Sequence, residues 1–502
     1  MKTVTCFCLG LFIIGKLTSQ NRYDNNWVFA RVDQGVLLNF NSDSLHVQYI
    51  PQLELRTVEA HMSMSDAEGN LLFYSNNCSI SNAAHQVMEN GEGLNPGLIQ
   101  TYWCSVNPYA NPHNQSILSL PSPENSNIYY VFHIDLELFN FGGPGGSDYA
   151  PMNLYKSLIN IQEENGLGKV IEKNIPILED SLAWNNLQAT KHANGRDWWI
   201  ICPEYKSNCY YKILLDPNGV TVAGKQCAGY SWEGYGATGG AYFTPDGARY
   251  VRSNADNGLN IFDFDRCTGE LSNPVHISLS PDTNRISSMA ISANSRFVYA
   301  IFLDKIFQFD LYADDIPTSK TLVALYDGYQ SAGNPTDFYH AKLAPDGKIY
   351  ICTFGPTYYL HTINNPDSVG IACQVLQHNV LLPYTHYAAM PNSPNYKLGS
   401  LPGPCDTIAV SANEILLEDG VIKIFPNPSS HIINIISERE NTQINEVRLY
   451  DLSGRLALKK DGNNALIQLN NKELQLPQGI YIVVVFDSLG RRHINKLVIE
   501  IN

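Results

Sequence analysis

A short polar turn followed by a run of β-forming residues recurs along the first four hundred residues. The turns are centred on Gly69, Ser126, Gly195, Gly247, Ser295 and Gly347, at intervals of 48 to 69 residues. Asp-Gly and Asn-Gly turns tolerate positive φ and join antiparallel strands. Aromatic and β-branched residues fit the surface of a half-buried sheet. The pattern therefore predicts a series of antiparallel sheets, each opened by the same kind of turn.

A repeat of about 40–50 residues that carries up to four strands is typical of a β-propeller blade. The six turns predict six blades over residues 20–399. A seventh blade is completed if the strand at 27–40 joins the stretch at 384–398. The alternative is an irregular pair of β-sandwiches, which does not need a turn at this period. The fold class predicted is all-β, a six- or seven-bladed β-propeller followed by a small immunoglobulin-like β-sandwich.

The sandwich is predicted from the last eighty residues. A Pro- and Gly-containing linker at 400–421 precedes a segment, 422–502, in which seven short strands alternate with turns. A domain of this size and pattern is typical of a small β-sandwich. Pro426 and Pro428 have no N–H for a ladder hydrogen bond, so we expect them at the start or edge of a strand.

The N-terminus has the pattern of a secretory signal peptide over residues 1–19. Lys2 precedes an apolar run from Val4 to Ile14, and the small Ser19 precedes a polar stretch. The alternative is a buried strand or helix. The run is about half the ~20 residues that span a bilayer, and no later segment is long and apolar enough to do so. We expect no transmembrane segment in the mature chain.

Composition and charge limit the classes of molecule that the protein is expected to bind. The chain has 502 residues and a net charge of −15, with 44% hydrophobic and only 16% charged residues, so disorder is excluded. Residues 20–422 hold 21 basic and 40 acidic residues, a net of −19, whereas residues 423–502 have a net of +2. Nucleic acids and anionic membranes are bound through Lys and Arg. We therefore expect no nucleic-acid partner.

The cysteines indicate an oxidising compartment. Two of the 11 lie in the predicted signal peptide, and in an exported protein the others are disulfide candidates. Connectivity does not follow from sequence alone. The pairs we predict are Cys202–Cys209, Cys78–Cys104, Cys227–Cys267 and Cys352–Cys373, which leaves Cys405 in the linker. The spacing fits no zinc motif, so we predict neither a metal site nor a cofactor.

Enzyme signatures are missing from the sequence, which contains no HExxH, GxSxG or Walker motif. This favours a binding protein and leaves the catalytic residues unassigned. The alternative is a glycoside hydrolase or polysaccharide lyase, which would use paired carboxylates. Asp263 and Asp265 alternate on a predicted strand, and four histidines (340, 361, 378 and 386) lie close in sequence, but solvated and structural roles are the default for both groups. An enzyme should bring carboxylates, or a histidine with carboxylates, together at the mouth of the central channel.

Paired aromatic residues are candidates for a ligand surface. Adjacent residues on a strand face opposite ways, so one member of Trp198–Trp199 and of Tyr210–Tyr211 is expected in the core. The other member is then available for a sugar or peptide, since aromatic rings offer rigid amphipathic area. A carbohydrate or protein ligand is the partner that the sequence predicts for the propeller.

Two segments resemble known families. The tail contains Pro426-Asn427-Pro428, Leu449-Tyr450-Asp451 with Gly454-Arg455, Leu476-Pro477 with Gly479-Ile480-Tyr481, and Lys496-Leu497-Val498. In this order the motifs closely resemble the type A C-terminal sorting domain of the type IX secretion system. Residues 341–382, with Met390-Pro391-Asn392 after them, resemble a blade common in exported β-propeller-like proteins of the Bacteroidetes, which are mostly of unassigned function.

The resemblance implies a route out of the cell. A sorting domain implies export through the periplasm, recognition by the type IX secretion translocon, and a final place on the cell surface or in the medium. Its motif residues are Pro426, Asn427, Pro428, Tyr450, Asp451, Gly454, Arg455, Gly479, Tyr481 and Lys496. The propeller, by contrast, resembles nothing that implies a reaction.

Overall fold

The chain forms two units in the computed structural model, residues 1–406 and 407–502. The structure describes residues 21–500 apart from 43, 106–111, 141–146, 184, 232–238, 256, 280–285, 403–404, 406–421, 438–441, 452–455, 475 and 489–491. The predicted signal peptide at 1–19 and most of the predicted linker therefore lie outside the described residues.

Seven sheets of three or four strands, together with two two-stranded sheets, make up the β-structure of the described part of the first unit. Two have three strands: β1 (Asn26–Arg31), β2 (Gln34–Asn39) and β3 (His46–Ile50), then β4 (Met62–Ser65), β5 (Leu71–Ser75) and β6 (Ile80–Asn82). The third sheet is formed by β7 (Ile117–Pro121), β8 (Ile128–Ile134), β11 (Asn153–Asn160) and β12 (Lys169–Glu179). All strand pairs are antiparallel.

The remaining four sheets of this unit have four strands each. They are β13 (Gln188–Lys191), β14 (Trp198–Pro203), β15 (Cys209–Asp216) and β16 (Gly219–Cys227); β17 (Gly239–Phe243), β18 (Arg249–Asn254), β19 (Gly258–Phe264) and β20 (Leu271–Ile277); β21 (Ile286–Ile291), β22 (Phe297–Phe302), β23 (Lys305–Asp310) and β24 (Thr321–Leu325); and β27 (Ala341–Leu343), β28 (Ile349–Ile351), β29 (Thr357–Ile363) and β30 (Val375–His386).

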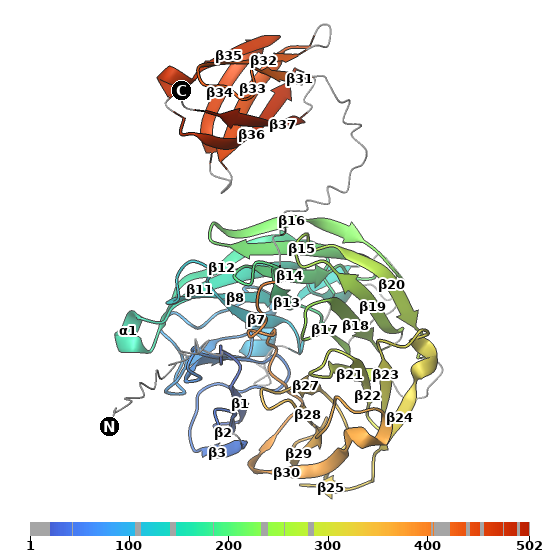
Figure 1. Cartoon of the computed structure of the whole chain (residues 1–502). Coiled ribbons are helices and arrows are strands. Elements are labelled where there is room, and N and C mark those ends of the chain that lie inside the picture. The colour runs from blue at the N-terminus through green and yellow to red at the C-terminus, as the bar shows by residue number, and fades with distance from the viewer. Residues whose placement is uncertain are drawn as a thin grey trace, which may run out of the picture. The chain divides into compact units, whose positions relative to one another are not determined.

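The sheets stand around a common axis as the blades of a β-propeller (Figure 1). Neighbouring blades pack through their first strands, with β4 on β7, β13 on β17, β17 on β21 and β21 on β27. The ring closes where β30 packs against β1, β2 and β3. The prediction of an all-β propeller is confirmed, with seven blades in the described residues. The strand expected at 27–40 is a hairpin, β1–β2, and belongs to a blade of its own.

Each turn of the sequence repeat joins the first strand of a blade to its second. The six turns connect β4–β5, β7–β8, β13–β14, β17–β18, β21–β22 and β27–β28. Gly69, Gly195, Gly247 and Gly347 adopt positive φ there, and so does Ser295. Glycine enters this region without steric cost. The turns therefore stand at one end of the ring, beside the axis, because the first strand of each blade is the innermost.

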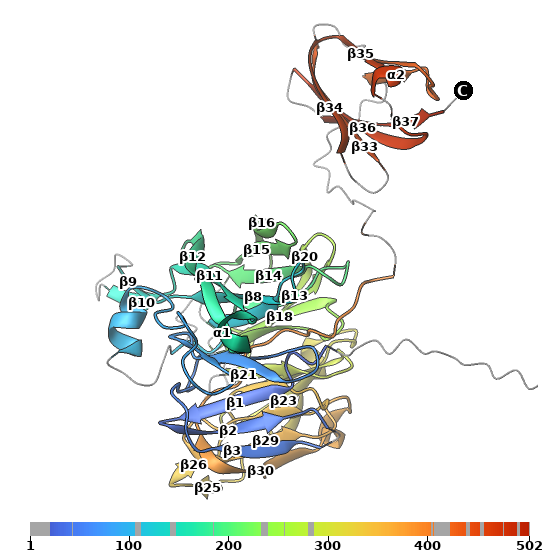
Figure 2. The same ribbon diagram turned by 90° about the vertical axis from the view of Figure 1, so that its left-hand side faces the viewer.

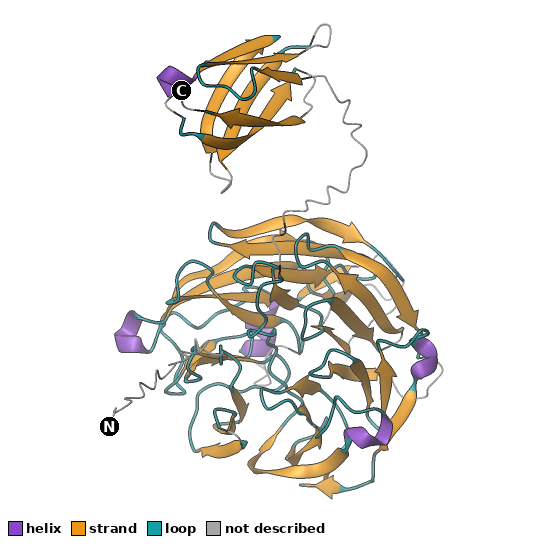
Figure 3. Ribbon diagram, viewed as in Figure 1, coloured by secondary structure: helices purple, strands orange, loops and turns teal. Residues whose placement is uncertain are grey.

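In the described residues of the first unit, regular structure outside the blades is limited to short pieces (Figure 3). The hairpin β9 (Glu137–Asn140) and β10 (Ser147–Ala150) branches from the third blade and stands apart from it in Figure 2. Other pieces are β25 (Gln330–Ser331) with β26 (Asn334–Pro335), and the short helices η1 (Ile99–Cys104), α1 (Glu163–Gly166), η2 (Pro317–Ser319) and η3 (Gly370–Cys373).

Blades are covered on both faces, which changes the outcome for the paired tryptophans. Trp198 and Trp199 point to opposite faces of β14, yet they are only 0% and 5% exposed. Trp198 packs with residues of the third blade, and Trp199 packs with residues of the fifth. The expectation that one of them is available for a ligand is therefore wrong, because a neighbouring blade buries each face.

The disulfides agree with the sequence prediction at one pair. Cys78–Cys104 is present, whereas the other bridges are Cys209–Cys227 and Cys267–Cys405. Cys209 lies directly opposite Cys227 on neighbouring strands. The predicted pairs Cys202–Cys209 and Cys227–Cys267 are wrong, since the antiparallel register places Tyr211, not Cys209, opposite Cys202.

The third wrong pair is Cys352–Cys373. Both thiols are free and buried, as is that of Cys202. Cys352 packs in the cluster that contains Trp27 and Phe29, and Cys373 packs in the one that contains Tyr299. The two side chains thus face different neighbouring blades and are separated by their own sheet.

The second unit is a two-sheet β-sandwich. One sheet contains β31 (Ile422–Phe425), β32 (Ile432–Ser437) and β35 (Leu466–Asn470), and the other contains β34 (Leu456–Asn464), β33 (Ile444–Asp451), β36 (Gly479–Asp487) and β37 (Arg492–Ile499). The short helix α2 (Asn471–Leu474) follows β35. Leucine, isoleucine and valine from both sheets meet in a single core, which explains the alternating pattern of the sequence.

Candidate functional site

Residues 388–396, which we call the axial segment, occupy the centre of the ring. The segment follows β30 and forms no strand, but most of its residues are buried. It bonds to five blades: Ala388 N–H donates to Thr353 O, Tyr396 Oη–H donates to Ser119 O, and Asn395 Nδ2 donates to Pro245 O, in addition to the bonds of Asn392 and Ser393 described below. Of the stretch at 384–398, residues 384–386 thus end β30, and from residue 387 onward the chain runs through the channel and adds no paired strand to a blade.

Asn392 is the most highly bonded residue of the axial segment. Its Nδ2 donates to Ile117 O (3.1 Å) and Leu187 O (3.0 Å), and its Oδ1 accepts from Gln188 Nε2 (3.2 Å). Its backbone N–H donates to His61 O (2.8 Å). Through its side chain and its backbone N–H, this one residue, 2% exposed, thus connects the inner ends of three blades.

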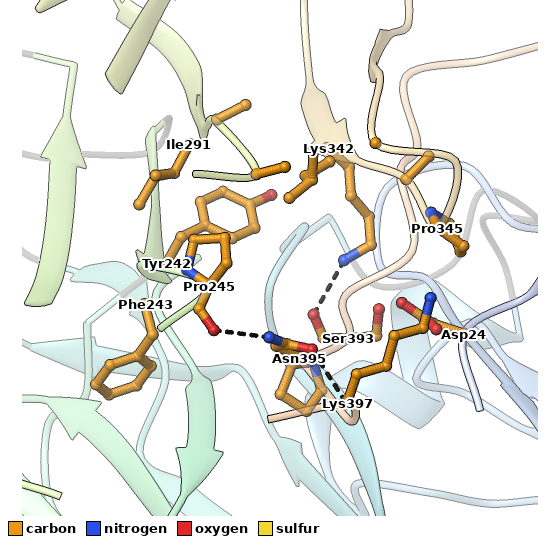
Figure 4. A pocket seen from close by; sticks show the side chains of 16 residues that line it. Asp24, Tyr242, Phe243, Pro245, Ile291, Lys342, Pro345, Ser393, Asn395 and Lys397 are labelled. Atoms are coloured by element: carbon orange, nitrogen blue, oxygen red, sulfur yellow. Dashed lines mark hydrogen bonds between the residues drawn. The ribbon is translucent and has the colours of Figure 1, made fainter. Parts of the chain in front are cut away.

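A cavity of about 200 Å³ lies at the turn end of the channel, next to the axial segment (Figure 4). Three turns of the sequence repeat contribute Pro245, Ala293 and Pro345 to its wall. The other lining residues are Asp24, Tyr242, Phe243, Ala290, Ile291, Lys342, Leu343, Ala344, Gly347, Ser393, Pro394, Asn395 and Lys397. Since these turns are the innermost points of their blades, the repeat itself builds the rim.

The cavity contains two lysines and one carboxylate. Lys342 comes from β27 and is 5% exposed, and its Nζ donates to Ser393 O (2.9 Å). Burial lowers the pKa of Lys342 to about 8, although Asp24 opposes that shift. Burial raises the pKa of Asp24, and Lys397 and Lys342 oppose the rise. The site can therefore offer positive charge and hydrogen-bond donors to a ligand within a largely apolar wall.

A second polar cluster lies at the opposite end of the innermost strands. Glu59 and His340 come just before β4 and β27, and Glu59 Oε2 is 4.0 Å from His340 Nε2. Burial raises the pKa of Glu59 to about 8 and lowers that of His340 to about 3, so both are neutral at pH 7. The Glu59 side chain keeps 21% of its surface accessible. The contact joins a histidine to a single carboxylate. His340 is one of the four histidines considered from the sequence, whereas Glu59 was not considered there.

The other carboxylates and histidines considered from the sequence are not among the residues that line the cavity. Asp263 pairs with Arg249 and accepts from Asn273 Nδ2, while Asp265 Oδ1 accepts from Cys267 N–H in a turn. His378 Nε2 contacts Asp327 Oδ2 at 2.7 Å, and its N–H donates to His361 Nδ1. Among the described residues no group of histidine, cysteine and carboxylate side chains is placed to hold a metal ion.

The tail motifs contact one another across the sandwich. Asn427 Nδ2 donates to Lys496 O (2.6 Å), and Val498 N–H donates to Asn427 Oδ1 (2.8 Å). Tyr481 Oη–H donates to Pro477 O (2.9 Å), and Asp451 lies opposite Tyr481 in the ladder. The proline motif is therefore held against the closing strand. Gly454 and Arg455 lie outside the described residues.

Comparison with known families identifies the tail. Residues 423–500 match the secretion system C-terminal sorting domain. The match covers the β-sandwich and the motifs named above, so the chain carries a type IX sorting domain and is exported to the outer surface or the medium. No helix in the described ranges is long and apolar enough to cross a membrane. A search of the curated proteins finds no match to the sequence.

Solved structures that resemble the chain are distant. A candidate 6-phosphogluconolactonase from Bacteroides fragilis is 11% identical with a TM-score of 0.43 and covers 73% of this chain and 98% of its own. The Swd1 β-propeller domain from Myceliophteria thermophila is 10% identical, with a TM-score of 0.36, covering 66% and 91%. PorZ, a surface component of the type IX secretion system of Porphyromonas gingivalis, is 13% identical, with a TM-score of 0.29, covering 95% and 74%. Similarity at this level assigns no activity.

Proposed function

We propose that this exported β-propeller protein binds a carbohydrate or protein ligand outside the cell through the cavity at the turn end of its channel. One observation carries the proposal. Buried polar groups, Lys342 and the hydroxyl of Ser393, line an open cavity that also has an apolar and aromatic wall. Sites for small ligands combine an apolar wall with a few convergent polar groups.

The test is a binding screen of the purified chain on glycan and protein arrays. Ala293 lies exposed at the rim of the cavity, so Ala293→Trp should block the cavity without disturbing the core. Ser126→Trp is the matched control, because Ser126 is an exposed residue in the corresponding turn of the third blade. We expect the arrays to identify a ligand whose affinity falls at least tenfold in Ala293→Trp and is unchanged in Ser126→Trp. Equal binding by both variants would contradict the proposal.

The second candidate is a hydrolase or lyase that acts on a polysaccharide, and the Glu59–His340 contact favours it. A carboxyl group that stays neutral near pH 7 can act as a general acid. Turnover of any polysaccharide by the purified chain, lost at least a hundredfold in Glu59→Gln, would establish this alternative. Unchanged turnover in Glu59→Gln would exclude this pair as its site.

A further inference from the structure

The cavity at the turn end contains hydrogen-bond donors that have no acceptor among the described residues. An ammonium group has three donors, and the one hydrogen bond found for Lys342 Nζ in the described structure is to Ser393 O. The Ser393 hydroxyl is buried and has no hydrogen-bond partner among the described residues. Leaving a buried hydroxyl unbonded costs about 1–3 kcal/mol. A ligand oxygen placed beside Lys342 and Ser393 would satisfy both groups.

One acceptor faces the same space. Asp24 Oδ1 is buried and has no hydrogen-bond partner in the described part of the chain. Figure 4 shows the Asp24 carboxylate next to the end of the Lys397 side chain. An ionised carboxylate accepts hydrogen bonds and cannot donate them. A ligand hydroxyl is therefore the natural partner for Asp24.

The opposite wall is apolar. Tyr242, Phe243 and Ile291 line it (Figure 4), and the Tyr242 hydroxyl already donates to Ala341 O (3.1 Å). Such a wall suits the C–H face of a ring and not a chain of polar groups. The volume sets the size: a cavity of about 150 Å³ holds one benzene ring, so about 200 Å³ holds one sugar ring.

The local charge selects the kind of sugar. The cavity carries two lysines and one carboxylate, within a segment, 20–422, whose net charge is −19. We infer that the cavity binds one carboxylate-bearing sugar residue, a hexuronate at the end of a glycan, with its carboxylate on Lys342 and Ser393 and a ring hydroxyl on Asp24. The inference rests on the proposed function and names the ligand class of that site.

The charge state of Lys342 supports this assignment. Its pKa of about 8 lies below the ordinary value, because burial disfavours the ammonium form. A bound carboxylate would favour the charged form, so affinity should fall as the pH rises above about 8. The other charged groups that face Lys342 are Asp24 and Lys397, while His61, whose own pKa is lowered to about 3 by burial and by Lys342, stays neutral.

The experiment is calorimetric titration of the full chain at pH 7 with D-glucuronate, D-glucose and acetate as probes. We expect glucuronate to bind at least tenfold more tightly than glucose or acetate. Lys342→Met should remove this preference, whereas Lys348→Met, the same change in the turn that follows β27 and outside the cavity, should keep it. Asp24→Asn should weaken glucose binding, because the carboxylate acceptor for a ring hydroxyl is lost, and should weaken glucuronate binding less, because the same substitution removes a negative charge from the cavity. It also provides a test should Lys342→Met fail to fold.

Three results would overturn the inference. Equal affinity for glucose and glucuronate would show that the cavity does not recognise the carboxylate. If acetate bound as tightly as glucuronate, the cavity would not recognise the sugar ring. A third result would be binding of a neutral glycan or a protein that Ala293→Trp blocks, together with no binding of glucuronate. This result would refute the inference, but the proposed function would still hold. If the chain bound no ligand on the arrays, the proposed function itself would be refuted.

Discussion

The propeller and the C-terminal sandwich bury different kinds of side chain. The core of the sandwich consists of isoleucine, leucine and valine with one tyrosine, Tyr481. The centre of the propeller instead buries His61, Lys342 and Asn392, each of which is 5% exposed or less. An apolar core requires only that side chains fill the space, whereas a buried polar centre requires each group to find its partner. The tail is thus built to fold as a module, and the centre of the propeller is built around particular polar contacts.

Removal of residues 407–502 should have the largest effect on export. The sorting domain is the part of the chain that the type IX secretion system recognises, so the shortened protein should remain in the periplasm. Fractionation of cells, followed by immunoblotting of periplasm, surface and medium, measures the change. The expected loss of surface and medium signal is more than tenfold. The matched control is a full-length Ser126→Trp chain, and an undiminished signal from the shortened chain would contradict the comparison.

Asn392→Ala should destabilise the propeller strongly. The change leaves Ile117 O, Leu187 O and the Gln188 side chain without the partners that Asn392 supplies. Each buried group left unpaired costs about 1–3 kcal/mol, so we expect a loss of about 3–5 kcal/mol in the free energy of unfolding. Thermal or urea unfolding of the propeller transition measures it. A loss below about 1 kcal/mol would show that the axial segment does not hold the blades together.

Glu59→Gln should change how propeller stability depends on pH. The folded-state pKa of Glu59 is raised from 4.5 to about 8, so the folded state holds a proton that the unfolded state releases. Stability of the natural protein therefore falls as the pH rises through this window. The variant lacks this loss and should gain up to about 4 kcal/mol relative to the natural protein between pH 4.5 and 8. Melting temperatures at both pH values measure it. A relative loss for the variant would instead indicate an ionised Glu59–His340 pair.

Asn427→Ala in the tail is the counterpart of Asn392→Ala and should have the smallest effect. Asn427 also bridges two backbone groups, Lys496 O and Val498 N, but these bonds are exposed to water. Water replaces exposed partners, so we expect a loss of about 1 kcal/mol in the stability of the sandwich. Urea unfolding of the tail transition measures it. A loss as large as that of Asn392→Ala would remove the contrast between the two regions.

The same contrast explains which features the sequence predicts. The blade turns around Gly247 and Gly347 and the motifs at Asn427 and Tyr481 are local patterns, and local patterns specify strands and turns. The cavity brings together Asp24, Tyr242 and Lys342, which are far apart in the chain and which no local pattern relates to one another. A signal was present in hindsight: Lys342 is a charged residue in a strand that directly precedes a repeat turn.

The disulfides and the axial segment show the same limit. Cys209 pairs with Cys227 because of the register between β15 and β16, and register is not encoded in the spacing of cysteines. The stretch at 384–398 contains β-forming residues, yet from residue 387 onward it is held by side-chain and backbone bonds to several blades and joins no ladder. Contacts of this kind become visible only when the ring is closed.

The most direct test of the account is a structure of the protein with its array ligand bound. The account predicts that the ligand lies in the cavity at the turn end, against Lys342 and Ser393, and that the sandwich carries none. A ligand bound beside Glu59, on the outer strands of the blades or on the sandwich would contradict it.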